Sequence, residues 1–148
     1  MKRVKMMFYL GLYLMDRNLS DSYPLKGDDL RHSLLEFIQL KKIQSGSLLT
    51  GVGCLSQAKI RLANEQKILH LDGPLEIISL SGTLTPKHVH IHISVADGEG
   101  RVYGGHLVPG CIVSYTAELC MIEYNNLNFE CEYDYQTGFD ELVILKRD

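Results

Sequence analysis

The stretch from Thr85 to Pro109 reads TPKHVHIHISVADGEGRVYGGHLVP, and it decides how the rest of the chain must fold. Its first half alternates strictly between polar and aliphatic residues, a period of two that is typical of a strand with one buried face. The aliphatic row, which must face a core, consists of Val89, Ile91, Ile93 and Val95. The opposite row, which must face outward, consists of His88, His90, His92 and Ser94.

The segment DGEG after this strand predicts a tight turn into a returning strand. If Asp97 pairs with Arg101 across a three-residue loop, Gly100 takes the left-handed conformation that such loops favour. That register places His92 opposite His106 on one face. A slip by one residue would send His106 to the other face, so the register decides whether the imidazoles converge.

The segment over residues 28–46 predicts a helix. Asp28 or Asp29 can cap its start, and Gly46 is expected to end it. The apolar residues that form one helical stripe are Leu30, Leu34, Leu35, Phe37 and Ile38. Most later segments are strand-like, with turns predicted at residues 72–74 and 125–126. We therefore expect an α+β fold, a compact and mostly antiparallel sheet with one main amphipathic helix on one face.

Composition predicts a single domain over residues 1–148, because 45% of the chain is apolar and can build a core. The net charge of -3 argues against binding nucleic acid through the overall field alone. The four cysteines form no CxxC pair, which excludes the usual thiol-redox motif and the ribbon type of zinc site. We expect Cys111, Cys120 and Cys131 to be buried and the protein to be cytoplasmic and reduced.

The N-terminal apolar run from Met6 to Met15 resembles a short signal peptide. No small-residue cleavage site follows it, and it is shorter than the roughly 20 residues that span a bilayer. We expect a first strand here, with a signal peptide as the alternative and no membrane partner. Residues 1–22 are thus either a strand of the domain or an N-terminal extension.

The outward histidines are the residues with the clearest chemical implication. His90 and His92 lie about 7 Å apart along a strand, and His106 from the returning strand would supply a third nitrogen. Three nitrogen ligands with one open coordination position are typical of zinc sites. His88 shares the face but lies one step further from the turn. The alternative is a solvated polar face that happens to contain histidines.

Three further residues are candidates for supporting roles. Glu76 lies in an apolar segment, and we expect it to be partly buried. It could orient a metal-bound histidine or act as a general base, or it could form an edge salt bridge instead. Gly104 and Gly105 would allow another backbone or a ligand to approach closely, with a β-bulge as the alternative.

Three segments, in this order and spacing, resemble the plants-and-prokaryotes-conserved (PPC) domain: GVGCLSQAKIRL, LEIISLSGTL and HVHIHISVADGEGRVYGGHL. The resemblance covers Tyr23 to Leu145, and the HxH strand with the GGH segment is its most specific part. It implies a homotrimer and a metal site at His90, His92 and His106. Plant members carry an Arg-Gly-Arg-Pro AT-hook that enters the DNA minor groove, and this sequence contains none.

Together these expectations describe a non-enzymatic, homotrimeric PPC-domain protein with a zinc site or a site for another divalent transition metal. A DNA-binding or regulatory role follows from the resemblance alone. The alternative is a metal-dependent enzyme that acts on a small molecule through His90, His92 and His106, since a metal with an open position can activate water.

Overall fold

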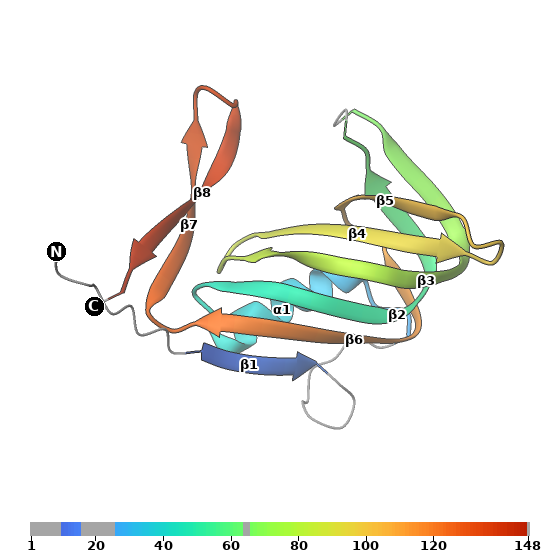
Figure 1. The fold of residues 1–148 in the computed structure, drawn as a ribbon, viewed down its shortest axis with the longest axis horizontal. Helices are drawn as coiled ribbons and strands as arrows, with labels where there is room; N and C mark the ends of the chain where they lie inside the picture. Colours follow the sequence, from blue (N-terminus) through green and yellow to red (C-terminus); the bar gives the residue numbers. More distant parts are fainter. Residues whose placement is uncertain (1–9, 16–25, 64–65, 148) are drawn as a thin grey trace, which may run out of the picture.

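The computed structural model describes residues 10–15, 26–63 and 66–147. A six-stranded sheet has the order β1-β6-β2-β3-β4-β5, and β7 and β8 form a separate hairpin that projects from it (Figure 1). All strand pairings are antiparallel. The predicted α+β fold is therefore confirmed. The elements are β1 Leu10–Met15, α1 Leu30–Lys41, β2 Gly46–Arg61, β3 Ile68–Leu84, β4 Val89–Asp97, β5 Val102–Leu107, β6 Ile112–Tyr124, β7 Leu127–Asp134 and β8 Phe139–Lys146.

The core lies between α1 and one face of the sheet. The aliphatic residues of β4 are all buried, as their alternation predicts. They belong to one apolar cluster with the buried helix residues Leu30, Leu34, Phe37 and Ile38, against which Leu35 packs. Because the inward face of β4 is fixed by this cluster, its histidine row faces away from the core.

Helix α1 begins as predicted and ends earlier than predicted. The carboxylate of Asp29 caps the helix by accepting a hydrogen bond from the backbone nitrogen of His32. The helix ends where Lys42 takes the left-handed conformation, with φ of 56°. The next residue, Ile43, is buried and its backbone nitrogen donates to the carbonyl of Ile38. The stop predicted at Gly46 is wrong, because burying Ile43 turns the chain before Gly46 opens β2.

Strand β3 is continuous through the segment where a turn was predicted. Gly73 and Pro74 are joined by a cis peptide bond and lie in a bulge opposite Ser56 of β2. A Cβ on Gly73 would lie 2.6 Å from the carbonyl oxygen of Leu55, so glycine allows the two strands to stay together. The predicted break at residues 72–74 is therefore wrong, whereas the turn at residues 125–126 is confirmed.

The sheet curls until β5 meets the end of β2. Ile60 pairs with Leu107 and Arg61 pairs with His106, so β2, β3, β4 and β5 form a closed ring. A Cβ on Gly105 would lie only 2.5 Å from the carbonyl oxygen of Arg61. The absence of a side chain at Gly105 thus allows the contact that closes the ring.

The first strand is confirmed for Leu10–Met15, which pairs with β6. The rest of the predicted N-terminal segment lies outside the described residues. No helix in the described part is long and apolar enough to cross a membrane.

All four cysteines are free, and Cys111 alone among them is buried. Cys120 is half-buried and Cys131 is exposed, so the predicted burial of these two is wrong. Cys131 lies on the projecting hairpin rather than in the sheet.

Candidate metal centre

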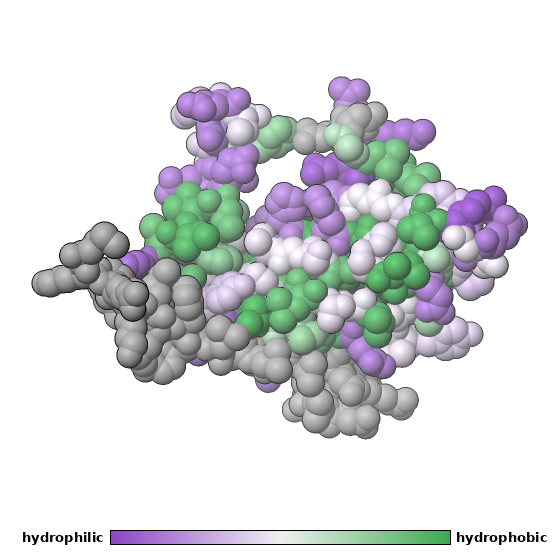
Figure 2. Space-filling view, in the orientation of Figure 1, coloured by the Kyte–Doolittle hydropathy of each residue, from purple (hydrophilic) through white to green (hydrophobic). Residues whose placement is uncertain are grey.

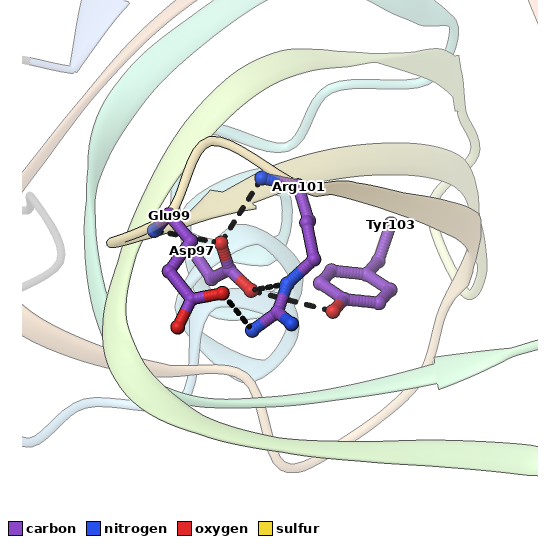
Figure 3. A network of polar contacts seen from close by, with 4 residues as sticks. All are labelled: Asp97, Glu99, Arg101 and Tyr103. Carbon is purple, nitrogen blue, oxygen red and sulfur yellow. Dashed lines mark hydrogen bonds and ion pairs between the residues drawn. The ribbon is translucent and has the colours of Figure 1, made fainter.

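The turn between β4 and β5 sets the position of His106. Its anchor is Asp97, whose Oδ1 accepts hydrogen bonds from the backbone nitrogens of Glu99 and Arg101, at 2.9 and 3.0 Å (Figure 3). Its Oδ2 accepts from Arg101 Nε at 2.8 Å and from the Tyr103 hydroxyl at 3.3 Å. The side-chain hydrogen bond from Arg101 is the largest influence on the Asp97 carboxyl and lowers its pKa. Gly100 has φ of 79°, as the predicted loop requires.

This turn produces the register in which the histidines converge. His92 lies directly opposite His106, and the pairing of β4 with β5 is regular through Gly104 and Gly105, without a bulge. The register predicted from the sequence is therefore confirmed. Residues that lie opposite each other in an antiparallel pair share a face, so His90, His92 and His106 all lie on the outer face of the ring.

The three imidazoles are close enough to share one ion. Their ring centroids are separated by 5.4 Å for His90 and His92, 5.0 Å for His90 and His106, and 5.8 Å for His92 and His106. One nitrogen from each ring lies within 4.8 Å of the other two. Zinc–nitrogen bonds of about 2.0–2.1 Å require nitrogens roughly 3.4 Å apart in a tetrahedral site. Small rotations of the exposed rings of His90 and His92 would close that difference.

One imidazole nitrogen of the cluster has no hydrogen-bond partner in the described part of the chain, and a bound metal ion could satisfy it. The Nδ1 atom of His106 is buried and has no hydrogen-bond partner among the described residues. Buried polar atoms are usually satisfied, so an orphaned imidazole nitrogen beside two other imidazoles fits a metal ligand set. The donor set of three imidazoles also matches the ligands that zinc prefers. The residues present therefore fit a zinc ion.

The electrostatics of the cluster favour the neutral form of imidazole, which is the form that binds metal. Burial lowers the pKa of His106 to about 4, and the nearby charge of Arg61 contributes to the decrease. Burial also lowers the pKa of His90, assisted by His92 and Arg61 and opposed by Glu141. Protons therefore compete weakly for these two nitrogens near neutral pH.

Two charged neighbours of the cluster are absent from the sequence-based prediction. Arg61 comes from the end of β2 and Glu141 from β8, and both influence the pKa of His90. Neither residue has a motif that links it to the histidines. Arg61 reaches the cluster only because the ring closes, and that pairing has no local signal in the sequence.

The other predicted residues, His88 and Glu76, lie outside the converging group. The ring of His88 is 6.5 Å from that of His90, and His88 is not part of the group whose ligand atoms converge. Glu76 is exposed, so the predicted burial is wrong. It pairs with Ala96, four residues along β4 from His92, and accepts a hydrogen bond from Cys54 Sγ at 3.4 Å.

A family comparison agrees with this arrangement. The family model of the Plants and Prokaryotes Conserved domain, abbreviated PCC or PPC, matches residues 25–125. The chain belongs to this family. The PPC domain thus includes all elements from α1 to β6 and all three converging histidines.

Two relatives place the PPC domain in larger proteins. The chain is 43% identical over 127 residues to the bifunctional protein GlmU of Synechococcus sp. strain JA-3-3Ab, covering 84% of this chain and 20% of that protein. It is 29% identical over 110 residues to the AT-hook motif nuclear-localized protein 16 of Arabidopsis thaliana, covering 70% of this chain and 42% of the relative. The chain therefore spans about a fifth of GlmU and less than half of the plant protein.

Solved structures share the fold over nearly the whole chain. A hypothetical protein from Salmonella enterica superimposes with a TM-score of 0.86 at 30% identity, covering 95% of this chain and 97% of that one. A PPC protein from Pyrococcus horikoshii gives a TM-score of 0.75 at 30% identity, with coverages of 97% and 99%. A metal-containing protein from Archaeoglobus fulgidus gives 0.67 at 24% identity, with coverages of 91% and 93%, and shows the fold alone.

Proposed function

We propose that this PPC-domain protein binds zinc, or another divalent transition metal, through His90, His92 and His106, and that it does so without catalysing a reaction. The observation that carries the proposal is the convergence of three imidazole nitrogens from two strands within 4.8 Å. The orphaned Nδ1 of His106 supports it, because a buried nitrogen without a partner is unfavourable. The lowered pKa values of His90 and His106 keep these ligands available at neutral pH.

The alternative is a metal-dependent enzyme that acts on a small molecule. Water activation at such a centre commonly uses a nearby carboxylate as general base. No aspartate or glutamate among the described residues belongs to the converging group: Glu76 lies four residues along the sheet from His92, and Glu141 influences the pKa of His90 without joining the group. This placement favours a binding function over hydrolysis.

Self-association is the second part of the proposal, with a homotrimer as the assembly. Figure 2 shows hydrophobic surface over the middle of the sheet and on the β7–β8 hairpin. On the sheet, Val52 and Ile78 are 53% and 55% exposed, and on the hairpin Phe139 and Ile144 are 50% and 57% exposed. Apolar surface of this kind marks contact sites between proteins. Trimeric assembly itself rests on the family resemblance.

A regulatory or DNA-associated role follows from the family and has no support in the charge of this chain. The plant relative carries an AT-hook motif by name, and this sequence has a net charge of -3. Direct DNA binding predicts an affinity that falls steeply with salt. A mobility shift that is absent at low salt, or flat with salt, would exclude it. A cytoplasmic location fits the four free cysteines, which persist in reducing compartments.

Metal analysis of purified protein tests the central proposal. We expect zinc in the protein as isolated, and we expect its loss in His90→Ala and His106→Ala. His70→Ala is the matched control, because His70 lies on β3 outside the converging group and is exposed. Native mass spectrometry reports the assembly of each variant. Wild-type protein that retains no metal after exposure to zinc would refute the site, and loss of the assembly in His90→Ala would assign this histidine a structural role instead.

A further inference from the structure

A positive side chain shares the face of the histidine cluster. Arg61, the last residue of β2, lies directly opposite His106 in the pairing that closes the ring. Residues opposite each other in an antiparallel pair have Cβ atoms about 4.5–5.5 Å apart on one face. Burial is the main cause of the lowered pKa of His106, and the charge of Arg61 is the next largest cause. Arg61 therefore shares the outer face of the ring with the candidate ligand His106.

Arg61 has no acidic partner in the described part of the chain. The salt bridges found there join His32 to Glu36, and Arg101 to Asp97 and Glu99. Arg61 is half-buried, and a guanidinium carries five N–H donors that need acceptors once water is removed. An oxyanion that accepts two of them in a fork would satisfy this requirement.

Two carboxylates act on other histidines of the row. Asp140 raises the pKa of His88, and Glu141 raises that of His90, both from strand β8. Neither influences the pKa of His106, whose charged neighbours are Arg61 and the other histidines. Arg31 lowers the pKa of His88, so charges of both signs act on that histidine, whereas no carboxylate of the described residues acts on His106. An anionic ligand would be attracted to Arg61, beside His106.

The charge balance of a loaded site points the same way. Three neutral imidazoles contribute no negative charge, so a divalent metal beside Arg61 would leave three positive charges close together. Such a concentration of charge is unfavourable in a partly buried site unless an anion compensates it. Glu141 is the nearest candidate within the chain, and its influence reaches His90 rather than His106.

We propose that the metal centre binds the oxyanion group of a small molecule, a carboxylate or a phosphate, which bridges the open metal position and the guanidinium of Arg61. This inference rests on the proposed metal site and assigns it a ligand class. Arg61 would act as a binding residue, because its fork matches both oxyanions. The protein would then respond to an anionic metabolite rather than to the metal alone.

Anion titration of the cobalt-loaded chain tests this inference. The visible absorption of bound Co²⁺ changes when its fourth ligand changes, and inorganic phosphate and acetate serve as the two probes. We expect at least one probe to alter the spectrum and to bind about 10- to 100-fold more weakly to Arg61→Gln, the effect of losing charge-assisted hydrogen bonds. The stronger probe identifies which oxyanion is preferred.

Arg31→Gln is the matched control, because Arg31 influences the pKa of His88 at the other end of the row. We expect it to bind the anion as the wild type does, and we expect Glu141→Gln to bind it more tightly because a repelling charge is removed. Arg61→Lys keeps the positive charge without the forked donor geometry, and we expect it to bind the anion with intermediate affinity. This variant replaces Arg61→Gln in the test if Arg61→Gln does not fold.

Metal content separates the two levels of the proposal. Protein that takes up no metal refutes the metal site and this inference with it. Protein that retains its metal in every variant but shows no anion response, or the same response with and without Arg61, refutes this inference alone. Loss of the metal in Glu141→Gln would also refute it, because Glu141 would then occupy the position assigned to the anion.

Discussion

Replacing Gly105 by alanine tests whether ring closure positions the candidate metal ligands. A Cβ at Gly105 would lie 2.5 Å from the carbonyl oxygen of Arg61 and 2.9 Å from Cγ2 of Ile60. Separations this short require β5 to move away from the end of β2, because one of the clashing atoms belongs to the backbone. Since the next residue is His106, this movement would carry a candidate ligand away from the cluster.

The magnitude follows from two opposing effects. Overpacking of this kind destabilises by about 1–3 kcal/mol. Replacing glycine by alanine also stabilises by about 0.4–1 kcal/mol through the unfolded chain. We therefore expect Gly105→Ala to reduce the free energy of unfolding by about 1–2 kcal/mol, which corresponds to roughly 2–8 °C in melting temperature for a chain of this size. Zinc affinity should fall about tenfold or more, as for other losses of ligand orientation.

Gly104→Ala is the matched control for this experiment. Its Cβ would lie 3.2 Å from the carbonyl oxygen of Ile93, a tight contact that needs a shift of only a few tenths of an ångström. Thermal unfolding with a chelator present measures stability, and competition with a chromophoric chelator measures zinc affinity. A Gly105→Ala protein with wild-type stability and zinc affinity, or one that matches Gly104→Ala in both, would refute the role assigned to ring closure.

Three further perturbations test individual parts of the structure. Asp29→Ala should lower the free energy of unfolding, measured in urea, by about 2–3 kcal/mol. It removes both the helix cap and the acceptor of the hydrogen bond from the Gly110 backbone nitrogen. Asp29→Asn keeps an oxygen acceptor, so an equal loss of stability in that variant would contradict this explanation. Asp97→Ala should speed hydrogen exchange at the backbone nitrogen of Arg101, and unchanged exchange would show that the turn does not need this carboxylate. Metal-free protein should lose stability as the pH falls from about 6.5 toward 4, because the unfolded chain takes up a proton that the folded chain refuses at His106. The urea midpoint against pH should be flatter in His106→Gln, and an equally steep profile would count against that assignment.

The sequence predicted the parts of the fold that depend on local periodicity. Strict alternation identifies the buried face of β4, and the Asp97 turn identifies its register with β5. Both signals are complete within a few residues, so no distant partner is needed to interpret them. The apolar stripe of α1 belongs to the same class of signal.

The wrong predictions arise where a distant strand changes the local rule. In the segment LEIISL, Ile78 is an extra residue in a bulge against β4, so Ile78 and Ser79 are exposed in succession and the period of two fails. Glu76 precedes this bulge and points outward by ordinary alternation, since its neighbours Leu75 and Ile77 are both buried. The break predicted at Pro74 failed because a bulge accommodates what normally ends a strand.

The sequence was sufficient to predict the three candidate metal ligands, but not the charged residues around them. His90 and His92 share a face by alternation alone, and His106 joins them through the turn. Arg61 and Glu141 come from β2 and β8, and their proximity depends on how the sheet curls and where the hairpin projects. The charges that govern ligand preference are thus properties of the tertiary structure.

The partnership of β1 with β6 has a consequence for biosynthesis. Leu10 lies beside Tyr124, so β1 pairs with a strand that follows it by about a hundred residues along the chain. Contacts that join such remote positions slow folding, because a long loop must close before they form. During translation β1 would stay unpaired until β6 has emerged, and chaperones that protect nascent strands would find their target there.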